Sequence, residues 1–197
     1  MYPSKVIGPN ILLMYLKPTL KNATILSKIV CENACYLSPF FEQMVQSYET
    51  PEKTLAAIEY DEMCRLQCQM LPYYIVKDNE ILGEITAEWR DKDDSTEVLY
   101  WINQKYNGLG YVSEAVKLME KALFNGGHNQ ICLYIKETNF RSQEVAKKNG
   151  YKLSDSGNYY YKTRKEYFKQ TAEKSQCVCQ QNRGIAHFFR TFWPHTR

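Results

Sequence analysis

The 197-residue sequence lacks any long apolar run and any export signal. Its longest uninterrupted hydrophobic stretch, Ile11 to Leu16, has six residues, whereas a membrane-spanning helix needs about 20. No basic start leads into an apolar segment with a small-residue cleavage site, so a secretory leader is not expected. These absences exclude a membrane-spanning protein and predict a cytoplasmic one with no membrane partner.

The sequence also has little excess charge. It carries 25 Lys and Arg against 22 Asp and Glu, a formal net charge of +3. Residues 171–197 hold four basic residues and one acidic residue, which leaves 21 of each sign in residues 1–170. Domains that bind nucleic acid usually show a basic face or stripe. The neutral body therefore predicts no nucleic-acid partner.

Seven cysteines are present, and an odd count without an export signal favours a reducing compartment over a disulfide scaffold. Cys31 and Cys35 are four residues apart, as are Cys64 and Cys68, so each pair can share a helix face. A four-thiolate zinc site is one interpretation. The alternative is free cysteine on two helices, which we favour because structural zinc usually has tighter loop spacing. No metal is predicted.

Residues 171–197 differ from the rest and are predicted to form a poorly ordered C-terminal extension to a single domain at 1–170. Two alternatives stay open for this extension. One is a segment with aromatic and basic residues that binds a partner or a membrane surface. The other is a metal site built from Cys177, Cys179, His187 and His195.

Apolar periodicity and turn residues predict a mixed α/β (α+β) domain. Asn22 is the expected N-cap of the first helix, and Thr50-Pro51-Glu52 is a typical start for the second. An aromatic connection at 36–41 is expected to separate them. Predicted helices are 22–31, 50–70, 112–125 and 140–149, and predicted strands are 11–16, 73–77, 81–90, 96–104, 131–136, 151–153 and 158–168. The strand–helix–strand step from 96–104 to 131–136 implies a parallel crossover.

Gly108 and Gly110 precede the most regular of these helices. A helix start presents unpaired N–H groups and the positive end of a dipole, so it can hold a phosphate group. Glycines let the backbone approach such an anion closely. A tight turn before a helix explains the pair equally well. No Gly-Lys-Ser/Thr follows, and the third glycine of a dinucleotide fingerprint is missing.

The wider pattern resembles the GNAT acetyltransferase superfamily, and most closely its RimJ/RimL-type branch. The resemblance covers about residues 10–170, and the order and spacing of its motifs carry it. A leucine–proline–aromatic segment, Tyr36-Leu37-Ser38-Pro39-Phe40, adds to it. The main motifs are Tyr100-Trp101-Ile102, Lys105-Tyr106-Asn107-Gly108-Leu109-Gly110-Tyr111, Ser113-Glu114-Ala115-Val116, Asn139-x-x-Ser142-x-x-Val145-Ala146 and Gly150-Tyr151.

The resemblance implies a mostly antiparallel sheet of six to seven strands with two splayed parallel strands at its centre, flanked by helices. It also implies acetyl-CoA as co-substrate. The diphosphate would lie on the backbone N–H groups of Gly108, Leu109, Gly110 and Tyr111, after Lys105, which replaces the family's Arg or Gln. The pantetheine would run beside Trp101, Ile102 and Asn103, with Asn139 and Ser142 near the sulfur.

Catalytic roles are also implied by the resemblance. Ser142 is the expected donor to the leaving thiolate, because Ala146 stands where many relatives have a tyrosine acid. Glu97 is the expected general base, because it opens the Trp101 strand, where some histone-type relatives carry a catalytic glutamate, whereas Tyr161 stands where the branch often has a glutamate. A backbone N–H near Ile102 is the expected oxyanion donor. The structural alternatives are that Ser142 only satisfies its helix start and that Glu97 is a solvated edge residue.

The expected acceptor is a primary amine, most simply a protein N-terminus of ribosomal type. Residues 42–62 carry six acidic side chains against one lysine, which would attract a cation if they line the entrance. A polyamine or aminoglycoside is therefore the alternative acceptor, and a non-catalytic CoA-binding module is the alternative function. The protein is expected to be a monomer or a homodimer.

Overall fold

An eight-stranded sheet organises the first of the two units into which the chain divides, Met1–Lys162 and Thr163–Arg197. The computed structural model describes residues 2–90 and 95–173. The predicted extension lies outside the described residues from 174 onward, together with its candidate metal ligands. The strands, in chain order, are β1 Lys5–Ile7, β2 Leu12–Met14, β3 Met70–Lys77, β4 Glu80–Arg90, β5 Ser95–Ile102, β6 Gln130–Tyr134, β7 Lys152–Leu153 and β8 Tyr159–Thr163.

The strand order is β1-β2-β3-β4-β5-β6-β8-β7. Strands β5 and β6 pair in parallel, whereas neighbours from β1 to β5 and the pair β7–β8 are antiparallel. The predicted mixed, mostly antiparallel sheet is confirmed, with eight strands. The extra strand is β1, whose three residues are too few to show an alternating pattern.

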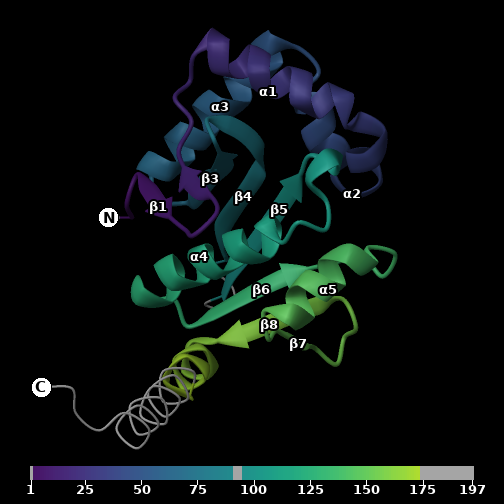
Figure 1. Cartoon of the computed structure of the whole chain (residues 1–197). Helices are drawn as coiled ribbons and strands as arrows, with labels where there is room; N and C mark the ends of the chain where they lie inside the picture. The colour runs from purple at the N-terminus through teal and green to yellow at the C-terminus, as the bar shows by residue number, and fades with distance from the viewer. Residues whose placement is uncertain (1, 91–94, 174–197) are drawn as a thin grey trace, which may run out of the picture. The chain divides into compact units, whose positions relative to one another are not determined.

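Five helices cover this sheet: α1 Leu20–Glu32, α2 Ala34–Ser47, α3 Pro51–Leu66, α4 Tyr111–Asn125 and α5 Phe140–Lys148. Figure 1 shows α1, α2 and α3 gathered beside β3 to β5, while α4 crosses in front of the strands and α5 lies beside β6. Helix α4 connects the parallel strands β5 and β6, so the predicted crossover is confirmed.

The first helix begins earlier than predicted, and its N-cap is Thr19 rather than Asn22. The Thr19 side chain accepts a hydrogen bond from the Asn22 backbone N–H at 3.3 Å. The Asn22 side chain instead donates to the Lys17 carbonyl, and Asn22 itself lies in the first turn of α1. The prediction was wrong because two residue types that favour N-caps lie three positions apart.

The predicted aromatic connection at 36–41 is helical and belongs to α2. Pro39 lies within α2, and Phe41 has φ −137° and ψ 48°, which marks a kink. A proline in a helix removes one hydrogen bond and bends the axis without always ending the helix. This bend is what directs the aromatic side chains of the segment, as described below.

Helix α3 begins as predicted, with the Thr50 side chain accepting from the Lys53 N–H at 3.2 Å. It ends at Leu66, four residues before the predicted end. Cys68 has φ 56°, and the N–H groups of Cys68 and Gln69 donate to the carbonyls of Arg65 and Cys64. These two bonds form a Schellman motif, which is usually built on glycine and was therefore not evident from the sequence.

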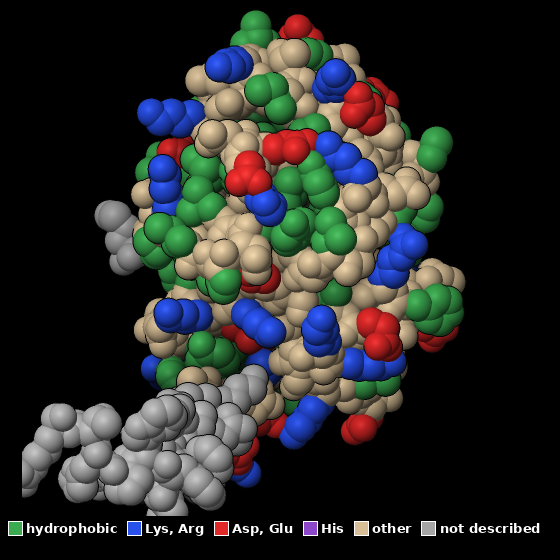
Figure 2. Space-filling view, viewed as in Figure 1, with side chains coloured by type: hydrophobic (Ala, Val, Ile, Leu, Met, Phe, Trp, Pro, Cys, Tyr) green, Lys and Arg blue, Asp and Glu red, His purple; other side chains and the backbone are tan. Residues whose placement is uncertain are grey.

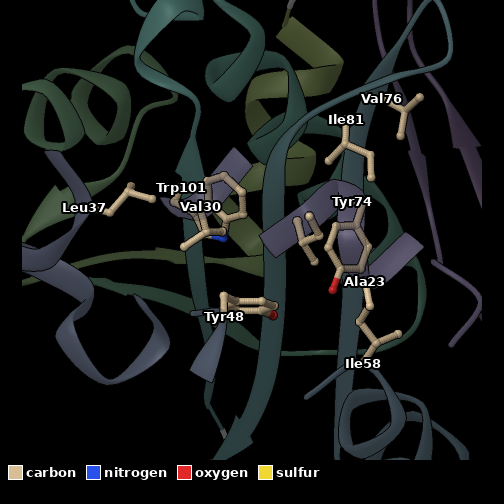
Figure 3. Packing of buried hydrophobic residues seen from close by; sticks show 10 residues of the cluster. Ala23, Val30, Leu37, Tyr48, Ile58, Tyr74, Val76, Ile81 and Trp101 are labelled. Carbon is tan, nitrogen blue, oxygen red and sulfur yellow. The ribbon is translucent and has the colours of Figure 1, made fainter. Parts of the chain in front are cut away.

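The hydrophobic core between α1–α3 and the sheet combines side chains from all three helices with side chains from β3, β4 and β5. Figure 3 shows Trp101 of β5 at one side of this cluster, beside Val30. The cluster of buried residues comprises Ala23, Leu26, Val30, Leu37, Tyr48, Ile58, Tyr74, Val76, Ile81 and Trp101. On α4, the predicted apolar stripe is buried at Ala115, Val116, Met119 and Leu123. Burial of these apolar surfaces is the main force that holds the helices on the sheet.

The predicted last strand, 158–168, is only half right. Strand β8 ends at Thr163, and residues 164–173 are helical. Within this second unit, the Glu166 N–H donates to Thr163 Oγ1 while Thr163 N–H donates to the Glu166 carboxylate at 3.0 Å. This reciprocal capping box starts a helix, and the sequence signal for it, Thr-x-x-Glu, was overlooked.

Lys and Arg side chains are interspersed with Asp and Glu over the face seen in Figure 2. This mixture matches the equal numbers of basic and acidic residues counted in residues 1–170. Within the described residues, no helix is long and apolar enough to cross a membrane.

Candidate functional site

The glycine turn before α4 leaves an exposed helix start with no side chain over it. Gly108 and Gly110 have φ of 79° and 84°, and Gly110 is the N-cap residue without a side-chain cap. A Cβ placed on either glycine would meet no atom within 4 Å. No protein atom covers the two glycines, so an anion can approach the uncapped start of α4.

Strands β5 and β6 separate beside this turn. Their paired residues run only from Ser95 with Gln130 to Glu97 with Cys132, although β5 continues to Ile102. The predicted splay of the two parallel strands is confirmed. Beyond Glu97 the backbone of β5 no longer pairs with β6, so an extended ligand can run along it as an added strand would.

A cavity of about 610 Å³ lies at this opening. Its walls come from α2, β5, the glycine turn, α4 and α5. The lining residues that matter here are Tyr36, Phe40, Phe41, Tyr100, Trp101, Ile102, Gly108, Gly110, Tyr111, Asn139, Arg141, Ser142 and Lys148. Seven of the sequence-predicted site residues are thus brought together around one space. We refer to it as the coenzyme cavity.

The start of α5 contributes Asn139 and Ser142 to the coenzyme cavity. Asn139 Oδ1 accepts from the Ser142 N–H at 3.2 Å, so Asn139 is an N-cap, as the sequence predicted. The Tyr100 hydroxyl donates to the Ser142 carbonyl at 3.4 Å, and burial raises the pKa of that phenol well above its usual value. Tyr100 therefore acts as a neutral strut that holds α5 on β5.

Positive charge reaches the coenzyme cavity from α5. Arg141 and Lys148 both line it, and both can approach a phosphate group. Lys105, which the resemblance placed before the glycines, pairs with Glu80 at 2.6 Å and lies over the Tyr106 ring. This partner raises the Lys105 pKa. The cations that face the cavity are therefore on α5 rather than at Lys105.

Helix α2 forms another wall of the coenzyme cavity. The Tyr36 hydroxyl donates to Asn107 Oδ1 at 3.2 Å, next to the glycine turn. The Arg141 guanidinium lies 6.0 Å from the centre of the Tyr36 ring, and Lys136 donates to the Pro39 carbonyl at 2.7 Å. Sequence reasoning did not assign these aromatic residues a role in the site. The available signal was the leucine–proline–aromatic resemblance at 36–40.

A second cavity, of about 720 Å³, lies on the other side of Trp101. Phe41, Tyr100 and Trp101 line both cavities and form the partition between them. We refer to the second space as the carboxylate cavity, because Asp61, Glu84 and Glu88 line it. Acidic residues at 42–62 were expected near an entrance, and of these only Asp61 lines the carboxylate cavity. Sequence reasoning gave Glu84 and Glu88 no role.

The structure does not bring four of the predicted site residues to the lining of either cavity. Glu97 is 8% exposed and pairs with Arg90, at the end of β5 remote from Trp101. Asn103 uses its side chain to accept from the Lys105 N–H, and Leu109 is exposed at the turn. Lys105 is the fourth. The general-base role of Glu97 stays a prediction.

Among residues 2–90 and 95–173, no group of three or more His, Cys, Asp or Glu side chains is placed to hold a metal ion. Cys31, Cys35 and Cys68 are exposed thiols, and Cys64 is buried. The chemistry available at the two cavities is therefore that of an uncapped helix start, cations at Arg141 and Lys148, the Ser142 hydroxyl and a set of carboxylates. This combination suits binding of a phosphate-bearing ligand next to a proton-transfer site.

Comparison with known proteins identifies the family of this chain. Residues 30–152 match the family model described as an acetyltransferase (GNAT) domain. The chain is 26% identical over 132 residues to the ribosomal-protein-serine acetyltransferase of Escherichia coli (strain K12). That alignment covers 65% of this chain and 72% of the relative.

Solved structures share the fold at low identity. RimJ of Mycobacterium smegmatis, in complex with a CoA disulfide, gives a TM-score of 0.73 at 16% identity, covering 84% of this chain and 91% of that one. The RimL ribosomal α-N-protein acetyltransferase, in complex with coenzyme A, gives 0.71 at 15% identity over 81% and 97%. A microcin self-immunity acetyltransferase holding acetyl-CoA and AMP gives 0.70 at 18% identity over 79% and 93%. Because the family model also spans more than half of the sequence, this chain belongs to the GNAT family and is an acetyl-CoA-dependent N-acetyltransferase.

Proposed function

We propose that this enzyme acetylates the α-amine of a protein N-terminus, of the ribosomal-protein type. The relative named above acts on a ribosomal protein, and the matched solved structures include RimL and RimJ. The observation that carries the proposal is the carboxylate cavity, which meets the coenzyme cavity at Trp101. A cationic N-terminus can enter there and reach the partition from the side opposite the coenzyme.

In this proposal the coenzyme occupies the coenzyme cavity in the orientation that the resemblance implies. The N–H groups from Gly108 to Tyr111 hold the diphosphate, and Arg141 and Lys148 add positive charge. The pantetheine follows β5 along Trp101, Ile102 and Asn103. The open space at both glycines and the uncapped start of α4 fit this group.

The reactive end then lies between Ile102 and α5. A backbone N–H near Ile102 stabilises the oxyanion that forms on the thioester carbonyl. Ser142, next to its N-cap Asn139, donates to the thiolate that leaves. The bound acetyl-CoA supplies the activated acetyl group.

An α-amine suits this chemistry better than a lysine side chain. The nitrogen must lose its proton before it attacks, and its ordinary pKa is near ~8 for an α-amine but ~10.4 for lysine. At neutral pH the α-amine therefore needs roughly 3 kcal/mol less help from a base, at about 1.4 kcal/mol per pKa unit.

The proposal is tested by acetyl-CoA turnover with a panel of amines. The panel contains peptides with free N-terminal Ser or Ala, the same peptides with a blocked N-terminus and an internal lysine, spermidine, and an aminoglycoside. We expect thiol release with the free peptides and a mass increase of one acetyl group at their N-terminal residue. Turnover of the blocked peptides at an equal rate contradicts the proposal.

Two other outcomes correspond to the alternatives. Turnover of spermidine or the aminoglycoside with no turnover of any peptide assigns a small-molecule acceptor. Coenzyme A binding without turnover of any amine assigns a non-catalytic CoA-binding module. The cytoplasmic location and the monomeric or dimeric state stay predictions.

A further inference from the structure

Three carboxylates from two elements meet in the carboxylate cavity. Asp61 comes from α3, and Glu84 and Glu88 come from β4. Side chains alternate along a strand, so residues 84, 86 and 88 share one face of β4. In the strand register, Glu84 stands opposite Tyr74 of β3 and Trp101 of β5, whose side chains lie on that same face. The carboxylates therefore lie on the same face as the tryptophan of the partition.

Glu84 is held directly at the partition. The Trp101 indole N–H donates to Glu84 Oε2 at 3.1 Å, and Thr86 Oγ1 donates to Glu84 Oε1 at 2.9 Å. Each oxygen of a carboxylate can accept more than one hydrogen bond, so both oxygens keep acceptor capacity. The two donors fix the orientation of the Glu84 carboxylate and leave it able to accept a further hydrogen bond.

Two polar atoms beside Glu84 have no hydrogen-bond partner of ordinary geometry among the described residues: the Tyr74 hydroxyl and Asp61 Oδ2. Tyr74 is 2% exposed and stands opposite Glu84 in the strand register. Figure 3 shows the oxygen atoms of Tyr74 and Tyr48 directed toward each other. Buried polar atoms are normally paired, and Asp61 lines the carboxylate cavity, so its unpartnered oxygen indicates a partner that comes from a ligand.

We propose that Glu84 takes the proton of the acceptor amine, and that Asp61 and Glu88 form with it the pocket that receives the ammonium group. An ammonium carries three N–H donors and no acceptor, which matches a cavity lined by three carboxyl groups, one of them with an unpartnered oxygen. This inference rests on the proposed function only in that the acceptor is an amine entering by the carboxylate cavity.

The charges of the pocket favour such a ligand. Burial raises the Asp61 pKa to about 8, and the charges of Glu84 and Glu88 add to the effect. Burial also raises the Glu84 pKa, partly offset by donation from Thr86, Trp101 and Tyr48. A cation relieves the repulsion among these groups. The titratable groups facing Glu84 are Tyr48 of the α2 end, Lys53, Tyr60 and Asp61 of α3, Tyr74 of β3 and Glu88 of β4.

The proton and bond changes balance as follows. The ammonium loses one proton to Glu84, and the neutral nitrogen then attacks the thioester carbonyl. The new C–N bond forms and the C–S bond breaks, and the nitrogen loses its second proton to water. The leaving thiolate gains a proton from water or from Ser142, which then recovers its own proton from water. The proton on Glu84 passes to solvent through the carboxylate cavity.

The first test compares Glu84→Gln with Glu97→Gln, the candidate named from the resemblance. We expect E84Q to lower kcat at pH 7 by about 100-fold or more, as removal of a general base typically does, and to leave the KM for acetyl-CoA unchanged. Glu32→Gln is the matched control, because Glu32 is an exposed α1 carboxylate outside the lining of both cavities. An E84Q activity within threefold of the wild type overturns the inference, as does a large loss in E97Q alone.

A pH profile distinguishes loss of a base from a packing defect. The E84Q variant can use only the fraction of the amine that is already deprotonated in solution. Its rate should therefore rise about tenfold per pH unit up to the amine pKa of ~8. The wild-type rate should rise less steeply. A constant ratio between the two profiles from pH 6 to 9 indicates a structural effect and contradicts the proposed role.

Glu88→Gln tests the pocket without risk to the core, because Glu88 is exposed. We expect its KM for the amine to rise about tenfold with kcat retained. Calorimetric titration of the wild-type complex with coenzyme A should detect binding of the same amine, weakened in E88Q. An unchanged KM, or no amine binding to the wild type, overturns the inference.

These results are separable from the proposed function. If no peptide is acetylated and spermidine is, the proposed protein N-terminus is not the acceptor. The comparison of E84Q with the wild type is then made with spermidine. If peptides are acetylated equally by wild type and E84Q, the acceptor stands and this inference fails.

Discussion

Lys162 Nζ lies 3.2 Å from both carboxylate oxygens of Glu120, and each side chain is 4% exposed. Lys162 also donates to the Asn149 carbonyl at the end of α5. The pair thus joins α4 to β8 and to the end of the helix that carries Ser142. Burial raises the Glu120 pKa, and the charge of Lys162 is the main opposing effect.

We predict that Lys162→Met lowers the free energy of unfolding by about 3–5 kcal/mol, because it leaves a buried carboxylate without its partner. The double variant E120L/K162M should lose much less. The control is Lys147→Met, which breaks the exposed Lys147–Glu144 pair and should cost under about 1 kcal/mol. Urea denaturation at pH 7 measures all three, and similar losses for K162M and K147M contradict the prediction.

Asp61 predicts how stability depends on pH. Its pKa is raised to about 8 by burial and by its carboxylate neighbours, so the folded chain holds a proton that the unfolded chain releases near pH ~4. The folded state binds more protons between these values. The contribution of Asp61 to stability is therefore present below about pH 4 and is lost as the pH rises toward 8, at up to about 1.4 kcal/mol per pH unit.

Asp61→Asn cannot titrate, so we expect its free energy of unfolding to fall less steeply than that of the wild type between pH 5 and 8. The difference between variant and wild type should grow in favour of the variant as pH rises. Asp155→Asn, at an exposed turn, is the control and should keep the wild-type slope. Parallel curves for D61N and the wild type contradict the raised pKa.

The features that sequence analysis predicted correctly are local ones. The glycine turn, α4 and the Asn139 cap each depend on residues within a few positions, and each was placed correctly. The α2 segment was misread because Pro39 is tolerated within a kinked helix, which only packing decides. The carboxylate cavity could not be predicted because Asp61 and Glu84 meet only through the packing of α3 on the sheet.

Gly110 predicts a separation between folding and coenzyme binding. Its φ of 84° strains any other residue, so Gly110→Ala should cost about 1–2 kcal/mol of stability, while the added Cβ meets no protein atom. The Cβ would, however, occupy the approach to the start of α4. We expect the Kd for coenzyme A to rise at least about tenfold, equivalent to about 1.4 kcal/mol.

Gly127→Ala is a matched control for this effect. Gly127 has φ 101°, and its Cβ would also meet open space, but it lies past the other end of α4. Its stability loss should match that of G110A, with unchanged affinity for coenzyme A by calorimetry. Equal affinities for the two variants would place the diphosphate elsewhere.

Ser142 and Asn139 separate a chemical role from a capping role at one helix start. Asn139→Ala removes the cap of the Ser142 N–H and should cost about 1 kcal/mol of stability. Ser142→Ala keeps that N–H and its cap, so stability should change little. If the Ser142 hydroxyl donates to the leaving thiolate, kcat of S142A should fall about 100-fold with the KM for acetyl-CoA retained.

Steady-state kinetics with the best amine and thermal unfolding of both variants measure these two effects. An S142A kcat within twofold of the wild type shows that water supplies the proton to the thiolate. Ser142 then has only a structural role in α5.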